Sequence, residues 1–181
     1  MTRLLRYPAA LLGLAAVAAC DATHAGPAGV VGTDRAPIAA AFPSMLGSYG
    51  GTAAAHVRTS GGHTYDVSCP LRVDVLTQTD DRFSGTVTVQ DNDHCKGESG
   101  TVRGTVEADG ALTVTAYTSD GTNVFESAAA RSGCTLVRSS GSFSGELVGN
   151  VVTAAGNGVY DCPYFGGFRA FVDVTVSAAR T

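Results

Sequence analysis

The chain has 181 residues, of which 44% are apolar and 15% charged, a composition that suits one globular domain and excludes a disordered chain. Its 23 glycines and large share of Ala, Thr, Ser and Val favour short strands and tight turns, and they exclude a long α-helical protein. The formal net charge of -4 provides no basic stripe for phosphates, so nucleic acid is excluded as an expected partner.

The first 19 residues have the layout of an export signal. Arg3 and Arg6 precede a short apolar run that ends in small residues. A helix that spans a bilayer needs ~20 apolar residues, so this run is too short to serve as one. The segment therefore predicts export of the chain, followed by removal of the signal.

The last four residues of this signal, Val17-Ala18-Ala19-Cys20, resemble the lipobox of bacterial lipoproteins. The resemblance covers the export segment only and implies that Cys20 becomes a lipidated first residue. Several acyl chains hold a protein on a membrane far more firmly than one. We therefore expect a lipid anchor in a bacterial membrane, with the protein facing the periplasm or the exterior. An ordinary secretory signal with a chance cysteine is the alternative, and Asp21 leaves inner and outer membrane both open.

Residues 20–43 contain three of the six prolines and show neither a strand period nor a helix period. We interpret them as a flexible tether that lifts a domain off the lipid surface. The predicted organisation is a signal peptide at 1–19, a lipidated tether at 20–43 and an all-β domain at 44–181.

From residue 44 onward, apolar residues recur at every second position, which predicts strands with one dry and one wet face. The clearest alternation covers residues 65–75, 83–89, 102–106, 112–116 and 168–176. Weaker runs cover residues 46–57, 122–128, 134–138, 142–148 and 151–156, and no helix of about ten residues is expected. Burial on one face is typical of antiparallel sheets, because parallel strands are covered on both faces.

These runs predict an antiparallel up-and-down barrel of about eight to ten strands, with a two-sheet β-sandwich as the alternative. Gly85, Gly104 and Gly145 fall on the dry face, where glycine lets a strand bend sharply, as a small barrel requires. The same glycines argue against a roomy cavity unless larger residues lie across from them.

Four cysteines remain once Cys20 is assigned to lipid, an even number in an oxidising compartment. Three pairings are open, and we favour Cys69 with Cys95 and Cys134 with Cys162, because the first pair flanks a hairpin. No cysteine or histidine spacing is typical of zinc, and no cofactor motif occurs, so we predict neither metal nor cofactor. The acidic loop 91–98 does not match a calcium loop and is interpreted as a solvated turn.

Five of the thirteen aromatic residues crowd into residues 160–171. Among them, Tyr160, Tyr164, Phe165 and Phe168 are the candidate binding residues, since exposed paired rings bury much area at low entropic cost. Phe171 is the odd ring on a polar face. The alternative is that these rings plug the end of the barrel or pack on the tether.

No set of catalytic residues is evident, because the four histidines are scattered along the chain. The leading hypothesis is a monomeric, lipid-anchored barrel that binds without catalysis, its ligand a small apolar molecule. The second is an inhibitor or assembly module that contacts an envelope protein through Tyr164 and Phe165. The third is a hydrolase whose residues converge only in space.

Overall fold

Nine strands and one short helix make up the part of the chain that the computed structural model describes, residues 41–93, 95–163 and 167–181. The predicted signal peptide, Cys20 and most of the predicted tether lie outside this part, as do Tyr164 and Phe165. In chain order the elements are β1 (Gly47–Thr59), β2 (Thr64–Thr79), β3 (Arg82–Val89), β4 (Glu98–Val106), β5 (Ala111–Thr118), α1 (Val124–Arg131), β6 (Thr135–Ser139), β7 (Phe143–Val148), β8 (Val151–Cys162) and β9 (Phe168–Arg180).

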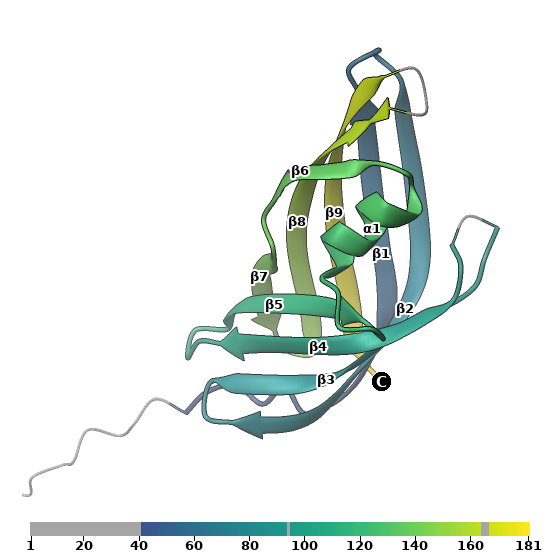
Figure 1. Ribbon diagram of the computed structural model, residues 1–181. Coiled ribbons are helices and arrows are strands. Elements are labelled where there is room, and N and C mark those ends of the chain that lie inside the picture. The colour runs from purple at the N-terminus through teal and green to yellow at the C-terminus, as the bar shows by residue number, and fades with distance from the viewer. Residues whose placement is uncertain (1–40, 94, 164–166) are drawn as a thin grey trace, which may run out of the picture. The chain divides into compact units, whose positions relative to one another are not determined.

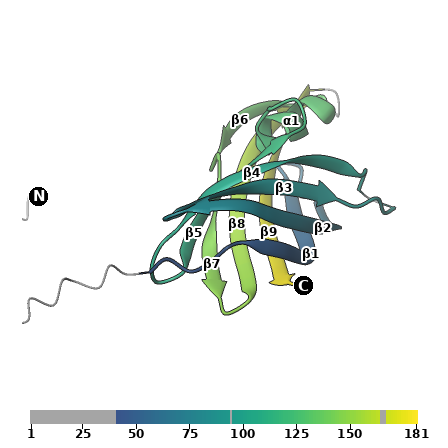
Figure 2. The ribbon, with the colours of Figure 1, turned by 90° about the horizontal axis from the view of Figure 1, so that it is seen from below.

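Eight of the strands close into an antiparallel barrel (Figure 1; Figure 2). Around the ring the order is β1, β2, β3, β4, β5, β7, β8 and β9, and β9 pairs back onto β1. The ring follows chain order once α1 and β6 are set aside, so the predicted up-and-down barrel is confirmed and the sandwich alternative is not. The ninth strand, β6, pairs with the upper part of β8, whereas β7 pairs with the lower part.

The segment 122–128 was expected to add a weak strand, and this expectation is wrong, because α1 begins at Val124. The Asn123 side chain accepts a hydrogen bond from the Phe125 N–H and so caps the first turn. Glu126 in the first turn and Arg131 in the last complement the helix dipole, and three consecutive alanines favour helix. No helix in the part of the chain that the structure describes is long and apolar enough to cross a membrane.

The barrel wall has a gap beside α1. β5 pairs with β7 only through Ala111–Val114, and the rest of β5 has β4 on one side. On its other side the described chain provides a single bridge, between Tyr117 and Asn123. α1 packs against β5 and β6 and covers this gap. The helix is therefore part of the wall, and it replaces backbone pairing with side-chain packing.

The glycines on the dry face stand where neighbouring strands approach closely. A Cβ at Gly85 or Gly145 would lie about 2 Å from a main-chain oxygen of the adjacent strand, 2.0 Å and 1.8 Å respectively. At Gly104 an added Cβ would lie 2.5 Å from Cζ of Phe83. These positions allow the strands to coil tightly, and the Phe83 ring fills the space that Gly104 leaves.

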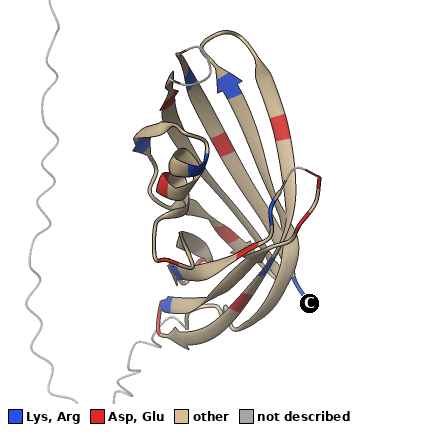
Figure 3. Ribbon diagram, turned by 45° about the vertical axis from the view of Figure 1, so that its right-hand side comes forward, with Lys and Arg blue, Asp and Glu red and all other residues tan. Residues whose placement is uncertain are grey.

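Charged residues are spread along the strands and loops (Figure 3), and none of those that the structure describes is buried. Cross-strand pairs include Arg58 with Asp173 at 3.0 Å and Arg169 with Asp161 at 2.7 Å. Hydrogen bonds from Arg169 lower the pKa of Asp161 below its ordinary value. Such exposed pairs contribute little to stability, so the fold depends on its apolar interior and its two disulfides.

Candidate ligand-binding site

The barrel encloses an apolar cavity of about 360 Å³. Valine is the commonest residue in its wall, as at Val73, Val114 and Val174. These three side chains point inward and are only half-buried, so their exposed surface faces the cavity. The volume lies near the lower end of the range for small-molecule sites, which is about 300 to 1,000 Å³. The barrel is therefore hollow in its middle and not filled by its own side chains.

No charged residue lines this cavity, and the only hydroxyl groups among its lining residues belong to Tyr49 and Tyr160. Apolar walls with one or two polar groups are typical of sites that bind hydrocarbon-rich molecules. The two tyrosines lie toward opposite ends of the barrel.

The lower end, where β1 begins and β9 ends (Figure 1), is closed by buried side chains. Met45, Tyr49, Val106 and Leu112 are buried there in one cluster. The Tyr49 hydroxyl accepts hydrogen bonds from Arg180, whose Nη2 lies 2.7 Å away, and the guanidinium also lies over the Tyr49 ring. This end is a sealed core with its polar group satisfied.

Helix α1 closes the upper part of the cavity by inserting one ring. The Phe125 ring stacks on Phe143 of β7, with ring centroids 5.2 Å apart. Both rings lie over Gly156, where an added Cβ would be 2.9 Å from Phe125 Cζ and 3.0 Å from Phe143 Cδ1. A side chain at position 156 would occupy their space, so this glycine makes the docking of the helix possible.

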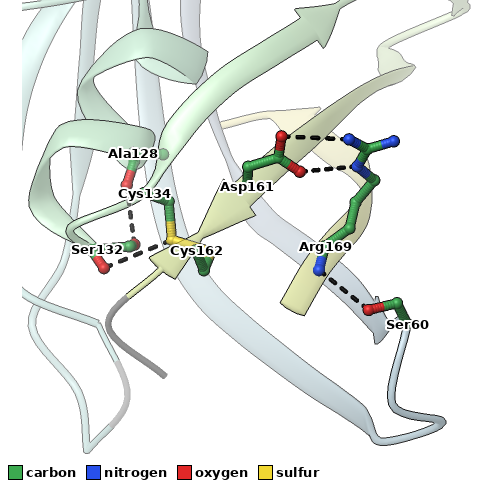
Figure 4. Close-up of a disulfide and its surroundings, with 7 residues drawn as sticks. All are labelled: Ser60, Ala128, Ser132, Cys134, Asp161, Cys162 and Arg169. Atoms are coloured by element: carbon green, nitrogen blue, oxygen red, sulfur yellow. Dashed lines mark hydrogen bonds and ion pairs between the residues drawn. A yellow bond between two sulfur atoms is a disulfide. The ribbon is translucent and has the colours of Figure 1, made fainter. Parts of the chain in front are cut away.

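The last turn of α1 has two further attachments. Arg131 forms a bidentate ion pair with Glu98 at the start of β4. A disulfide then joins Cys134, just beyond the helix, to Cys162 at the end of β8 (Figure 4). Ser132 also donates a hydrogen bond to the Ala128 carbonyl, which closes the helix end. The helix is thus tied to β4 on one side and to β8 on the other.

Access to the cavity lies beside this helix. Among the lining residues, all of which the structure describes, Ala128 of α1 is the exposed one. A second hollow of about 480 Å³ shares Ala128, Tyr160 and Val172 with the cavity. The two hollows therefore adjoin where α1 faces β8 and β9.

Tyr160 stands at this junction, with only 6% of its surface exposed. Its ring folds back over Gly158. A Cβ added at Gly158 would lie 2.6 Å from the Tyr160 hydroxyl oxygen. Burial raises the pKa of Tyr160 above its ordinary value, so the phenol stays protonated near neutral pH.

Of the four candidate aromatics, the structure brings Tyr160 and Phe168 together as lining of the second hollow, whereas Tyr164 and Phe165 lie outside the described residues. Tyr65, the first residue of the alternating run 65–75, also lines that hollow but is 56% exposed. Phe171 lies on the outer face and is 36% exposed.

Both favoured cysteine pairs are confirmed as disulfides, Cys69–Cys95 and Cys134–Cys162. In the acidic loop, Asp91 accepts a hydrogen bond from the Gly97 N–H, and Glu98 is engaged by Arg131. These two carboxylates therefore have structural contacts of their own.

The sequence interpretation missed the contribution of α1. Phe125 and Ala128 of α1 line the cavity, yet neither was a candidate, because the segment 122–128 was assigned to a strand. A signal was present: Asn123 followed three residues later by Glu126 is a common start of a helix, and Gly133 follows its end. The eight-residue helix was shorter than the length that we required.

No family model and no curated protein matches the chain. Among solved structures it is similar to a redesigned β-barrel, with a TM-score of 0.38 and 9% sequence identity over 75% of this chain and 90% of that one. The barrel assignment comes from the closed ring of strand pairs described above.

Proposed function

We propose that this protein is an envelope lipoprotein, anchored to a bacterial membrane through Cys20, whose barrel binds a small apolar molecule and catalyses no reaction. The observation that carries the binding proposal is the apolar cavity of about 360 Å³. A ligand there gains about 25 cal/mol for each Å² of apolar surface removed from water. The lining offers no charged group for proton transfer to a substrate, which supports binding over catalysis.

The cavity proposal is tested by filling the cavity. Val174 points inward and lines it, whereas the next residue, Thr175, is exposed on the outer face. Native mass spectrometry of the purified domain should show a bound apolar molecule in the wild-type protein and in T175F. The V174F variant should carry none, because its ring occupies the cavity. Equal ligand occupancy in V174F and T175F would contradict binding inside the barrel.

The anchor proposal rests on the lipobox-like segment that ends at Cys20. Cells fed labelled palmitate should incorporate the label into the wild-type chain, and C20A should lose it. A C69A variant serves as the matched cysteine control, since Cys69 is bonded to Cys95 and not lipidated. Label retained in C20A would rule out the anchor and leave the binding proposal untouched.

A further inference from the structure

The Tyr160 hydroxyl has no hydrogen-bond partner among the described residues, although only 6% of the residue's surface is exposed. In that part of the chain, no side-chain nitrogen or oxygen that is sealed from solvent lacks a partner. The Tyr160 hydroxyl therefore keeps contact with space that a small molecule can reach. A hydroxyl that meets accessible space and has no partner within the protein can form its hydrogen bond with a bound molecule.

The direction of the side chain identifies the space that the hydroxyl faces. Tyr160 lies on the inward face of β8, two residues beyond Gly158, and its hydroxyl lies over that glycine. From there the inward face continues to Gly156, which is covered by Phe125 and Phe143. The phenol thus points back along β8 toward the middle of the barrel, where the cavity lies.

The surroundings decide which ligand group suits the hydroxyl. Since its pKa is raised, the phenol is a donor at neutral pH and meets a hydrogen-bond acceptor best. A carboxylate would enter an apolar cavity with no charged lining residue to pair with it, and such burial is costly. A neutral acceptor, such as a ketone, ester or ether oxygen, avoids that cost.

We propose that the barrel binds a neutral, largely hydrocarbon molecule that carries one hydrogen-bond acceptor, and that the Tyr160 hydroxyl donates to this acceptor. The proposal rests on the proposed function, since it names the ligand class of the same cavity. The hydrocarbon part lies against the valines of β2, β5 and β9, and the acceptor lies near Gly158 of β8.

Two probes of similar shape test this proposal: acetylnaphthalene, a ketone, and ethylnaphthalene, its hydrocarbon counterpart. Their dissociation constants are measured by fluorescence titration of the domain. Y160F removes only the hydroxyl, and it should weaken acetylnaphthalene binding about tenfold while leaving ethylnaphthalene binding unchanged. Naphthoate, the charged counterpart, should bind the wild-type protein more weakly than acetylnaphthalene.

Y117F is the matched control, because Tyr117 alternates with the inward Ala116 on β5 and lines neither hollow. It should leave the binding of both probes unchanged. Y160F loses no hydrogen bond of the protein, so its melting temperature should match that of the wild type, which separates a binding defect from misfolding.

Three outcomes overturn the proposal in distinguishable ways. If Y160F leaves both probes unchanged, or weakens both equally, the hydroxyl does not select an acceptor, while binding in the barrel stands. If naphthoate binds more tightly than acetylnaphthalene, the ligand class is anionic. If the wild-type protein binds none of the probes, the proposed function fails together with this inference.

Discussion

The two ends of the barrel each bury one tyrosine, and they treat its hydroxyl differently. Tyr49 at the lower end is 2% exposed and accepts hydrogen bonds from Arg180, within a cluster of buried apolar residues. Tyr160 in the upper half is 6% exposed, and its hydroxyl forms no hydrogen bond within the described residues. The lower end is therefore a packed core that stabilises the fold. The upper half keeps a cavity beside α1, and the Tyr160 hydroxyl there is available to donate a hydrogen bond.

Of the changes that test this comparison, removal of a disulfide should have the largest effect on the free energy of unfolding. The sequence separations of the two disulfides are similar, 26 residues for Cys69–Cys95 and 28 for Cys134–Cys162, so removing either one should cost about 3 kcal/mol of unfolding free energy. Only the second bond joins the end of α1 to β8 beside Tyr160.

Paired cysteine-to-alanine variants, studied by urea denaturation, should therefore show equal destabilisation but unequal ligand affinity. The C134A/C162A protein should bind acetylnaphthalene more weakly than the C69A/C95A protein. Equal affinities would mean that the position of α1 does not shape the cavity.

A matched pair of valine truncations compares the closed end with the hollow middle. Val106 is 0% exposed in the lower cluster, and V106A should cost about 2 to 3 kcal/mol, because it leaves a void in a packed core. Val174 already faces the cavity, so V174A should cost about 1 kcal/mol. Chemical denaturation measures both values. Equal losses would indicate a barrel that is packed solid in its middle.

The docking of α1 is probed at Gly156. An alanine there would place its Cβ 2.9 Å from Phe125 and 3.0 Å from Phe143, so the rings must shift and the helix with them. We expect G156A to cost about 1 to 2 kcal/mol and to speed hydrogen exchange in α1. Gly61 has only ordinary contacts around an added Cβ, at 3.7 Å or more, so G61A should be nearly neutral. Unchanged exchange in G156A would show that the helix does not depend on this contact.

The smallest expected effect is acid sensitivity at the turn that leads into α1. A hydrogen bond from the Thr118 hydroxyl, together with the Thr122 N–H, lowers the pKa of Asp120 from its ordinary 3.8 to about 2. Because the folded pKa is the lower one, the stabilisation is present above pH 3.8 and is lost as the pH falls toward 2.

Thermal melts of the wild type and D120N should therefore differ at neutral pH and converge as the pH falls through this window. The difference should be a few degrees at most, since the carboxylate is exposed to solvent. A gap that stays constant from neutral pH down to pH 2 would exclude Asp120 as the titrating group.

The sequence was sufficient to predict the strands, but it was not sufficient to predict the structure of the segment between β5 and β7. Alternation predicted the inward faces of β2, β3, β4, β5 and β9, because a strand must hide every second side chain from water. The prediction failed for the segment around Val124, since five apolar residues in eight fit a strand and a short helix equally well. Capping by Asn123 decides between them, and it is a local signal that the strand pattern concealed.

What the sequence by itself determined is an all-β domain with an apolar inside, a polar outside and four paired cysteines, because these depend on neighbouring residues and on composition. Only the tertiary structure decided that the ring closes, that α1 fills its gap, and that the interior keeps a cavity. It also decided which tyrosine is satisfied, since Arg180 reaches Tyr49 across 131 positions of chain and no comparable partner reaches Tyr160 in the described residues. Such contacts are set by how the strands close around the barrel, which no local pattern records.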